Sequence, residues 1–275
     1  MYSIKNIVKN ICPPFLFNLL KFIFSRQNKF YGHYNNWYDA NAVCDKGYDS
    51  NKILQKVLES SLKVKNGEAI FERDSVLFDE IKYSWPVTTS LMLAAALNTG
   101  NLNVLDFGGA LGSHYNQNIK LLKLISDVKW NIVEQENLVK LGKIHFQSNN
   151  IKFYLTIPDC LMYNKPNLVL LSSVLQYLPE PWQTLKEIIK INAKIVVLDR
   201  TPFASNQIEE VKIQVVPDHI YNARYPCRFF NETKMLEIFK IAGYSLLETF
   251  NSIDKFEDFP PWKGHIFIKN SNIIE

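Results

Sequence analysis

The sequence predicts an α/β fold with a mostly parallel sheet that is covered by helices on both faces. From residue 102 onward, short and almost continuously apolar runs rich in valine, isoleucine and leucine alternate with segments of helical character. This alternation is typical of parallel strands that are buried on both faces. The first run leads into the stretch FGGALG at residues 107–112, which holds three of the ten glycines of the chain. Glycines grouped at the end of a strand indicate that a ligand approaches the backbone there.

Seven runs are expected to be strands. The runs that should be parallel are residues 102–107, 129–135, 151–155, 167–174 and 193–199. Two further runs, residues 244–250 and 264–270, could form an antiparallel pair at the edge of the sheet. Residues 101–275 are therefore expected to be the core of the protein.

The chain before residue 101 is expected to have two parts. Residues 36–100 read as a mostly helical cap, in which two helices end at Gly67 and Gly100. Residues 1–35 form a basic amphipathic arm, whose apolar run of about ten residues is shorter than the roughly 20 that span a bilayer. The arm could lie in a membrane interface, or it could pack on the protein body or on a second subunit. Its charged residues are all basic: Lys5, Lys9, Lys21, Arg26 and Lys29.

Composition and charge exclude several classes of protein. The chain has 275 residues, of which 47% are hydrophobic, so no part reads as disordered. The net charge of +4 belongs largely to the arm, and the nearly neutral body argues against a nucleic-acid binder with a broad basic face. The cysteines are far apart, which predicts reduced thiols in a cytoplasmic protein with neither a disulfide framework nor a metal site. They are Cys12, Cys44, Cys160 and Cys227.

The residues around the glycine loop favour a cationic ligand over a pyrophosphate. Asp106 precedes Gly108, Gly109 and Gly112 in the order D-x-G-x-A-x-G, whereas a dinucleotide site prefers G-x-G-x-x-G. A carboxylate there would repel a pyrophosphate and would suit a ligand with an amino group. Glu134 ends the next strand, where Rossmann-like folds place the carboxylate that binds ribose hydroxyls. The alternative is that both acids are solvated loop residues.

The glycine loop resembles motif I of the class I S-adenosylmethionine-dependent methyltransferases. Further blocks between about Trp37 and Phe250 are similar to a family of bacterial methyltransferases that are often encoded among surface-polysaccharide genes. These blocks include FERDSVLFDEIKYSWP, WNIVEQ, LLSSVLQYLPEPW, LDRTPF and VPDHIYNARYP. The resemblance implies a Rossmann-like class I methyltransferase fold with a seven-stranded sheet, and S-adenosylmethionine as the cofactor.

The resemblance also implies which residues hold the cofactor. The glycine loop would pass under its methionine part, Glu134 would receive the ribose, and Asp159 could accept from the adenine amino group. Ser172 and Ser173 would lie beneath the sulfonium, unless the two serines are an ordinary helix cap. The expected cofactor-binding residues are Asp106, Gly108, Gly109, Gly112, Glu134, Asp159, Ser172 and Ser173.

Methyl transfer to a hydroxyl benefits from a general base. The candidates near the predicted strand ends are Asp199, His219 and His114, in that order. Arg200 could clamp an anionic acceptor group in a bidentate fork. Alternatively, Asp199 and Arg200 form a structural pair, His219 is an exposed loop residue, and His114 caps the helix after the glycine loop.

Aromatic and charged residues are expected around the acceptor. Tyr83 and Trp85 could offer flat faces to a sugar ring or a base. Arg73 and Asp74 precede them, and a buried ion pair that docks the cap on the core accounts better for Arg73. The expected substrate-binding residues are Tyr83, Trp85, Gln176, Arg200, Tyr221 and Arg224.

The sequence therefore predicts an S-adenosylmethionine-dependent methyltransferase that acts on oxygen of a sugar or sugar-linked group in a surface-polysaccharide precursor. The substrate would be a glycan, a nucleotide sugar or a lipid-linked intermediate, and the arm would contact the inner face of the membrane if it binds lipid. Two alternatives stay open. One is an NAD-type oxidoreductase, which Asp106 and the missing G-x-G-x-x-G disfavour; the other is a membrane-associated partner protein that keeps the fold without catalysis.

Overall fold

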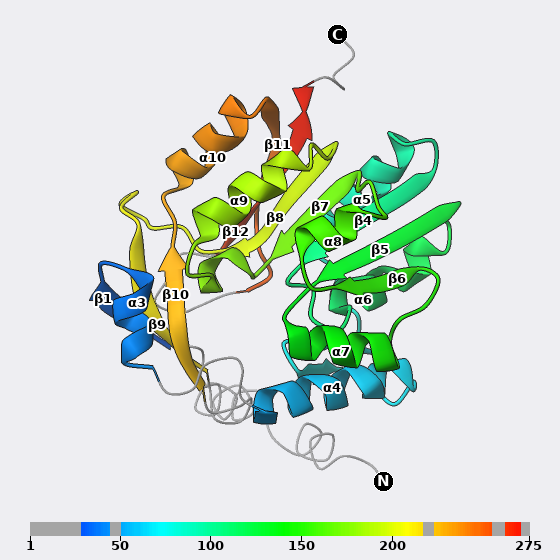
Figure 1. The fold of residues 1–275 in the computed structure, drawn as a ribbon, viewed down its shortest axis with the longest axis horizontal. Helices are drawn as coiled ribbons and strands as arrows, with labels where there is room; N and C mark the ends of the chain where they lie inside the picture. Colours follow the sequence, from blue (N-terminus) through cyan, green and yellow to red (C-terminus); the bar gives the residue numbers. More distant parts are fainter. Residues whose placement is uncertain (1–28, 45–50, 217–222, 255–261, 271–275) are drawn as a thin grey trace, which may run out of the picture.

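A seven-stranded sheet organises the part of the chain that the structure describes, residues 29–44, 51–216, 223–254 and 262–270 (Figure 1). The structure is a computed structural model. Most of the arm, residues 1–28, lies outside these ranges, and so do His219 and Tyr221. Within the described ranges, no helix is both long and apolar enough to cross a bilayer.

The strand order of this sheet is β11-β12-β8-β7-β4-β5-β6. The five parallel strands are β8, β7, β4, β5 and β6. At the edge of the sheet, β12 pairs antiparallel with β8, and β11 pairs antiparallel with β12. The prediction of five parallel strands and an antiparallel edge pair is therefore confirmed. The strands are β4 (Asn101–Phe107), β5 (Asp127–Val133), β6 (Ile151–Tyr154), β7 (Leu168–Ser172), β8 (Ile195–Thr201), β11 (Tyr244–Asn251) and β12 (Lys263–Lys269).

Helices cover both faces of the sheet, as the apolar strands predict. Ile195 and Val197 of β8 pack into a core cluster with α5, α6 and α7, whereas Val196 and Leu198 pack into a second cluster with α8, α9 and α10. Successive side chains of a strand point to opposite faces, so one apolar run supplies both clusters. The helices are α5 (Trp85–Ala96), α6 (Ser113–Leu122), α7 (Glu136–His145), α8 (Ile157–Leu161), α9 (Pro181–Lys190) and α10 (Glu232–Ile241).

A hairpin interrupts the helices that precede the sheet, which corrects the prediction of a mostly helical segment. α3 (Trp37–Ala42) and α4 (Asn51–Lys65) are followed by β2 (Phe71–Arg73) and β3 (Val76–Phe78), which pair antiparallel. The two residues of the turn, Asp74 and Ser75, have φ of 51° and 65°. Such a type I′ turn normally carries Asn-Gly, Asp-Gly or Gly-Gly, and Ser75 stands where the glycine is usual, so the ordinary hairpin signal is missing here.

A second, antiparallel sheet was not predicted. It has the order β1-β9-β10, and its strands are β1 (Lys29–Tyr34), β9 (Glu210–Val216) and β10 (Ala223–Phe229). The short 3-10 helix η1 (Leu175–Tyr177), which follows β7, packs against β10. Since β1 pairs with a strand far along the chain, no local pattern reveals it.

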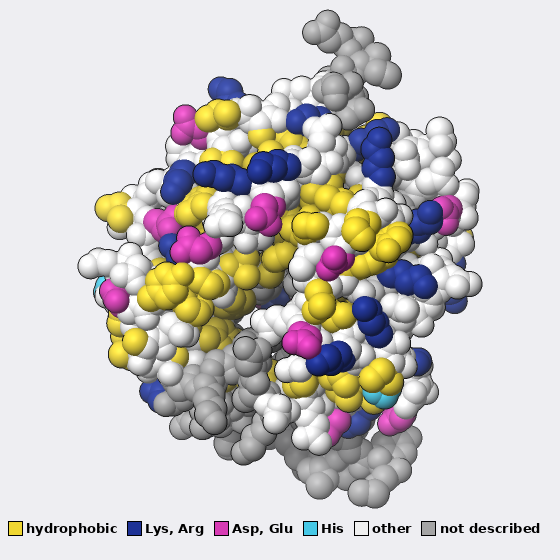
Figure 2. Space-filling view, viewed as in Figure 1, with side chains coloured by type: hydrophobic (Ala, Val, Ile, Leu, Met, Phe, Trp, Pro, Cys, Tyr) yellow, Lys and Arg dark blue, Asp and Glu magenta, His cyan; other side chains and the backbone are white. Residues whose placement is uncertain are grey.

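Charges of both signs are interspersed on the face shown in Figure 2, with apolar side chains between them. This distribution agrees with the nearly neutral body that the composition predicts.

Candidate active site

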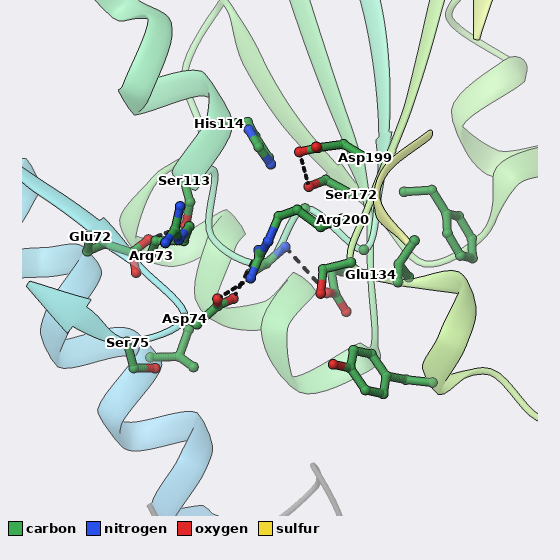
Figure 3. A pocket seen from close by; sticks show the side chains of 18 of the residues that line it. Glu72, Arg73, Asp74, Ser75, Ser113, His114, Glu134, Ser172, Asp199 and Arg200 are labelled. Atoms are coloured by element: carbon green, nitrogen blue, oxygen red, sulfur yellow. Dashed lines mark hydrogen bonds and ion pairs between the residues drawn. The ribbon is translucent and has the colours of Figure 1, made fainter. Parts of the chain in front are cut away.

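A cavity of about 580 Å³ lies at the carboxyl ends of β4, β5, β7 and β8. Its floor is the glycine loop and the ends of these strands, and its cover comes from the β2–β3 hairpin, β9, β10 and the segment after β11. Figure 3 shows side chains from these separate elements pointing into one space. In an open α/β sheet this is where a ligand is expected, because the chain reverses its direction of strand addition between β4 and β7.

The glycine loop is packed so closely that side chains are excluded. Gly108 has a φ of 75°, and a Cβ there would lie 2.4 Å from Val174 Cγ2. A Cβ on Gly109 would lie 2.5 Å from the Asp106 carboxylate. Gly112, with a φ of 96°, caps the start of α6. Gly108 and Gly109 thus bring bare backbone to the cavity floor, whereas Gly112, which was also expected to bind the cofactor, does not line the cavity.

Asp106 supports this loop from below and does not face the cavity. Its Oδ2 accepts a hydrogen bond from Trp130 Nε1 at 3.0 Å, and its side chain is fully buried. Burial, together with the charge of Glu134, raises the pKa of Asp106 to about 7, although the Trp130 bond opposes the shift. The expected direct contact with a ligand amino group is therefore replaced by a structural role under Gly109.

Glu134 lies at the end of β5, on the cavity wall. Its Oε1 accepts from the Ala110 backbone N–H at 3.3 Å, and its Oε2 accepts from the Gln135 N–H at 2.6 Å. The carboxylate is thus held against the glycine loop, at the place where the sequence predicts a ribose site.

Asp199 is the buried carboxylate at the end of β8. Its Oδ2 accepts from Ser172 Oγ at 2.9 Å, and its Oδ1 is buried with no hydrogen-bond partner among the described residues. The Ser173 N–H donates to the Asp199 carbonyl at 3.0 Å. Burial raises the pKa of Asp199 to about 6, against the lowering effects of Arg200 and Ser172. Ser172 and Ser173 therefore line the cavity and also position Asp199.

His114, the second residue of α6, also lines the cavity. Its Nδ1 is buried and has no hydrogen-bond partner in the described part of the chain. Burial and the nearby Arg200 lower the pKa of His114 to about 4, so the ring is neutral near pH 7. Figure 3 shows the Asp199 carboxylate extending toward the side where His114 lies, with Arg200 below both.

The Arg200 guanidinium is occupied by two carboxylates. Its Nε donates to Asp254 Oδ2 at 2.5 Å, and its two terminal nitrogens donate to the two oxygens of Asp74. Arg73 Nη2 lies 3.6 Å from Asp254 Oδ1. The predicted clamp on an anionic acceptor is therefore wrong, because the fork of Arg200 already binds Asp74. Arg73 and Asp74, which were expected to form an ion pair with each other, pair instead with Asp254 and Arg200.

Besides Asp106 and Gly112, five predicted site residues do not line the cavity: Tyr83, Trp85, Asp159, Gln176 and Arg224. Tyr83 and Trp85 stack on each other with ring centroids 4.8 Å apart, and 62% of the Trp85 surface is exposed. Asp159 is exposed on α8, where Thr156 caps the helix. Arg224 lies on β10, although its neighbour Tyr225 lines the cavity.

Gln176 is fully buried behind the cavity wall rather than facing a ligand. Its Nε2 donates to Ser173 Oγ at 3.1 Å and to the Arg200 carbonyl at 3.2 Å. It therefore fixes the backbone that carries Ser173 and Arg200.

Several lining residues were missed by sequence reasoning. Asp254 has no local signal, since it follows an edge strand, and Glu72 belongs to the β2–β3 hairpin, which no local pattern predicts. Burial raises the pKa of Glu72 to about 7, and its Oε1 accepts from Ser113 Oγ at the start of α6. The others come from the unpredicted second sheet and η1: Tyr177, Gln214, Val216 and Tyr225.

No protein-family model and no curated protein matches this chain. Among solved structures, a putative S-adenosylmethionine-dependent methyltransferase from Listeria monocytogenes is 14% identical, with a TM-score of 0.48, and the match covers 67% of this chain and 97% of that one. The N-terminal domain of EvdMO1, crystallised with S-adenosylhomocysteine and D-fucose, is 13% identical, with a TM-score of 0.46, over 81% of this chain and 97% of that one.

A third similar structure is the magnesium protoporphyrin IX methyltransferase of Synechocystis with bound S-adenosylmethionine, which is 13% identical, with a TM-score of 0.42. That match covers 82% of this chain and 100% of the other. The fold of this protein is established by the strand order and directions of its own sheet.

We expect Gly108→Ala to abolish ligand binding in the cavity, whereas Gly67→Ala keeps it. Both glycines have φ near +76°, at 75° and 77°, so both variants carry a left-handed alanine at a cost of about 1–2 kcal/mol. Only at Gly108 does the new Cβ meet another side chain, since nothing lies within 4 Å at Gly67. Calorimetric titration with S-adenosylhomocysteine compares the two. Equal loss of affinity in both variants would contradict the role assigned to close packing at Gly108.

Proposed function

We propose that this protein is an S-adenosylmethionine-dependent methyltransferase that acts on oxygen. The observation that carries the proposal is that the glycine loop, Glu134, Asp199 and His114 line one cavity, and that Asp199 Oδ1 and His114 Nδ1 are buried with no hydrogen-bond partner among the described residues. The first two are suited to a nucleoside ligand, and the last two are suited to proton transfer.

The residues present fit this cofactor. Gly108 and Gly109 leave no room for a Cβ, so the bare backbone can pass beneath the methionine part. Glu134 would accept hydrogen bonds from the ribose hydroxyls. The carboxylates of the cavity would also favour a cationic sulfonium. When bound, S-adenosylmethionine supplies a methyl group on a sulfonium sulfur, which leaves as a neutral thioether once an acceptor oxygen attacks the methyl carbon.

The residues of the chain then have to hold the acceptor in line and remove its proton. Asp199 Oδ1 accepts the proton of the acceptor hydroxyl as the new carbon–oxygen bond forms. Ser172 holds the other oxygen of this carboxylate, so the free oxygen keeps its orientation. His114, neutral near pH 7, would hydrogen-bond the same hydroxyl. The residues that cover the cavity would keep water away from the sulfonium. Methyl transfer to the aligned acceptor would then be favoured over hydrolysis of the cofactor.

For the acceptor we propose a sugar hydroxyl in a surface-polysaccharide precursor. This choice of acceptor rests on the resemblance of the sequence to bacterial methyltransferases that are often encoded among surface-polysaccharide genes. A dinucleotide oxidoreductase fits less well, because a pyrophosphate at the glycine loop would lie beside the carboxylate of Glu134, which accepts from the Ala110 N–H of that loop.

Calorimetry should show binding of S-adenosylhomocysteine and none of NAD. Glu134→Ala should weaken that binding by about 1.5–3 kcal/mol, because hydrogen bonds to a charged group are lost. Glu136→Ala is the matched control, since Glu136 pairs only with Lys140 on the surface of α7. Micromolar binding of NAD without any response to S-adenosylhomocysteine would overturn the proposed function.

Asp199→Asn should lower the turnover number by about 10²–10⁴-fold, because the amide cannot accept a proton, while the affinity for S-adenosylhomocysteine is nearly kept. In the wild-type protein, the base is active as a carboxylate, so the rate should fall as the pH is lowered through about 6, the pKa of Asp199. The rate of transfer from labelled S-adenosylmethionine is measured against pH. Asp127→Asn, exposed at the opposite end of the sheet, is the control. An unchanged rate in Asp199→Asn would remove Asp199 as the base.

We further propose that the arm attaches the protein to the cytoplasmic face of a membrane. The proposal rests on its basic residues, each of which would contribute about 1 kcal/mol near an anionic surface. Flotation with anionic liposomes compares the full chain with a chain that lacks residues 1–28 and so keeps β1. The full chain should float at low salt and the shortened chain should not. If both stay in the soluble fraction, the arm has a packing role instead.

A further inference from the structure

Asp74 and Asp254 bind the guanidinium of Arg200, so the cavity wall presents paired carboxylates there and, within the described residues, no free guanidinium. Only 9% of the Arg200 side chain is exposed, whereas 49% of the Asp74 side chain is. Figure 3 shows the Asp74 carboxylate against the end of the Arg200 guanidinium, and both residues line the cavity. Asp254 binds Arg200 from a second direction, and 13% of its side chain is exposed.

The charges along the described wall of the cavity are predominantly negative. Two guanidinium groups, Arg73 and Arg200, line it, and both are paired with Asp74 or Asp254. The described lining contains no lysine. The carboxyl groups of the lining are Glu72, Asp74, Glu134, Asp199 and Asp254.

From this arrangement we infer that the acceptor unit bound beside Arg200 is uncharged, and that Asp74 is the residue that excludes anionic acceptors. The inference rests on the proposed methyltransferase function and narrows its substrate class. A carboxylate or phosphate on this unit would meet the Asp74 carboxylate, and it could reach the fork of Arg200 only by displacing Asp74. A hydroxyl-bearing neutral unit meets no such repulsion.

The polar atoms that lack partners suit the same class of ligand. Asp199 Oδ1 can only accept a hydrogen bond, and neutral His114 can donate or accept through its ring nitrogens. A hydroxyl group both donates and accepts, so it can satisfy these two atoms together. Apolar and aromatic side chains, including Phe78 and Tyr225, complete the wall, and they favour a ligand without formal charge at this end.

The hairpin turn makes Asp74 suitable for a clean substitution. Asp74 has a φ of 51°, and asparagine tolerates this left-handed conformation as well as aspartate does. Asp74→Asn therefore keeps the backbone and the size of the side chain while removing the charge that occupies Arg200. The two terminal nitrogens of Arg200 then lose their carboxylate partner, while Nε keeps Asp254, and they can bind an anion with charge-assisted hydrogen bonds.

Phosphate binding provides a test that does not require the natural acceptor. Full-length protein saturated with S-adenosylhomocysteine is titrated with inorganic phosphate at constant ionic strength. The wild-type protein should show no binding in the millimolar range. Asp74→Asn should raise the affinity for phosphate by about 10- to 100-fold, as expected for new hydrogen bonds to a charged group. In the double variant Asp74→Asn/Arg200→Gln, this gain should be lost.

Glu136→Gln is the matched control, because it also removes one carboxylate from an ion pair but lies on the surface of α7. It should bind phosphate no better than the wild type. Millimolar or tighter binding of phosphate to the wild-type protein, or no gain in a folded Asp74→Asn, would overturn the inference.

If Asp74→Asn does not fold, the wild-type titration alone decides. Failure of S-adenosylhomocysteine to bind would instead contradict the proposed function, and phosphate is then titrated into the free protein with the same expected results.

Discussion

The pairing of one buried guanidinium determines how the cover of the cavity is placed over the sheet. An unpaired buried ion costs several kcal/mol, so Arg200 at the end of β8 requires carboxylate partners. It finds them in two segments that are remote in the sequence, Asp74 in the β2–β3 hairpin and Asp254 after β11. The left-handed backbone of Asp74 and Ser75, each of which costs of order 1–3 kcal/mol, is offset by these contacts. The hairpin therefore sits where its turn can reach Arg200, and this closes the cavity from above.

The same guanidinium influences the protonation of the groups that it does not bind. Burial alone would raise the pKa of Asp199 further, and the positive charge of Arg200 opposes this, so the value stays at about 6. The charge acts on His114 in the opposite sense, since both burial and Arg200 disfavour the imidazolium. Near neutral pH the result is an ionised Asp199 beside a neutral His114. Arg200 thus supports the proposed chemistry without touching an acceptor.

The sequence was informative where the signals are local and silent where they are long-range. The parallel strands, the glycine loop and Glu134 could all be predicted, because each depends on consecutive residues with a characteristic spacing. The hairpin was missed because Ser75 occupies the second turn position, which glycine usually marks. The second sheet was missed because β1 pairs with β9, about 180 residues away, a contact whose closure no local pattern encodes. Asp106 was assigned a ligand, but the Trp130 side chain that binds it from the neighbouring strand could not be foreseen.

Asp199 and Arg200 are adjacent in the sequence, yet the first lies at the cavity floor and the second binds the hairpin that covers the cavity. An irregularity of the sheet makes this possible. In a regular strand, Asp199 and Arg200 would point to opposite faces. Here Leu198 pairs with His265 and Thr201 with Lys263, so the two residues stand opposite Gly264 alone. This is the geometry of a β-bulge, which re-aims side chains near functional sites. With Arg200 at a φ of 53°, both side chains enter the cavity, Asp199 toward the floor and Arg200 toward the hairpin. The orientation of the proposed base, Asp199, and of the guanidinium that binds Asp74 thus depends on one extra residue in β8.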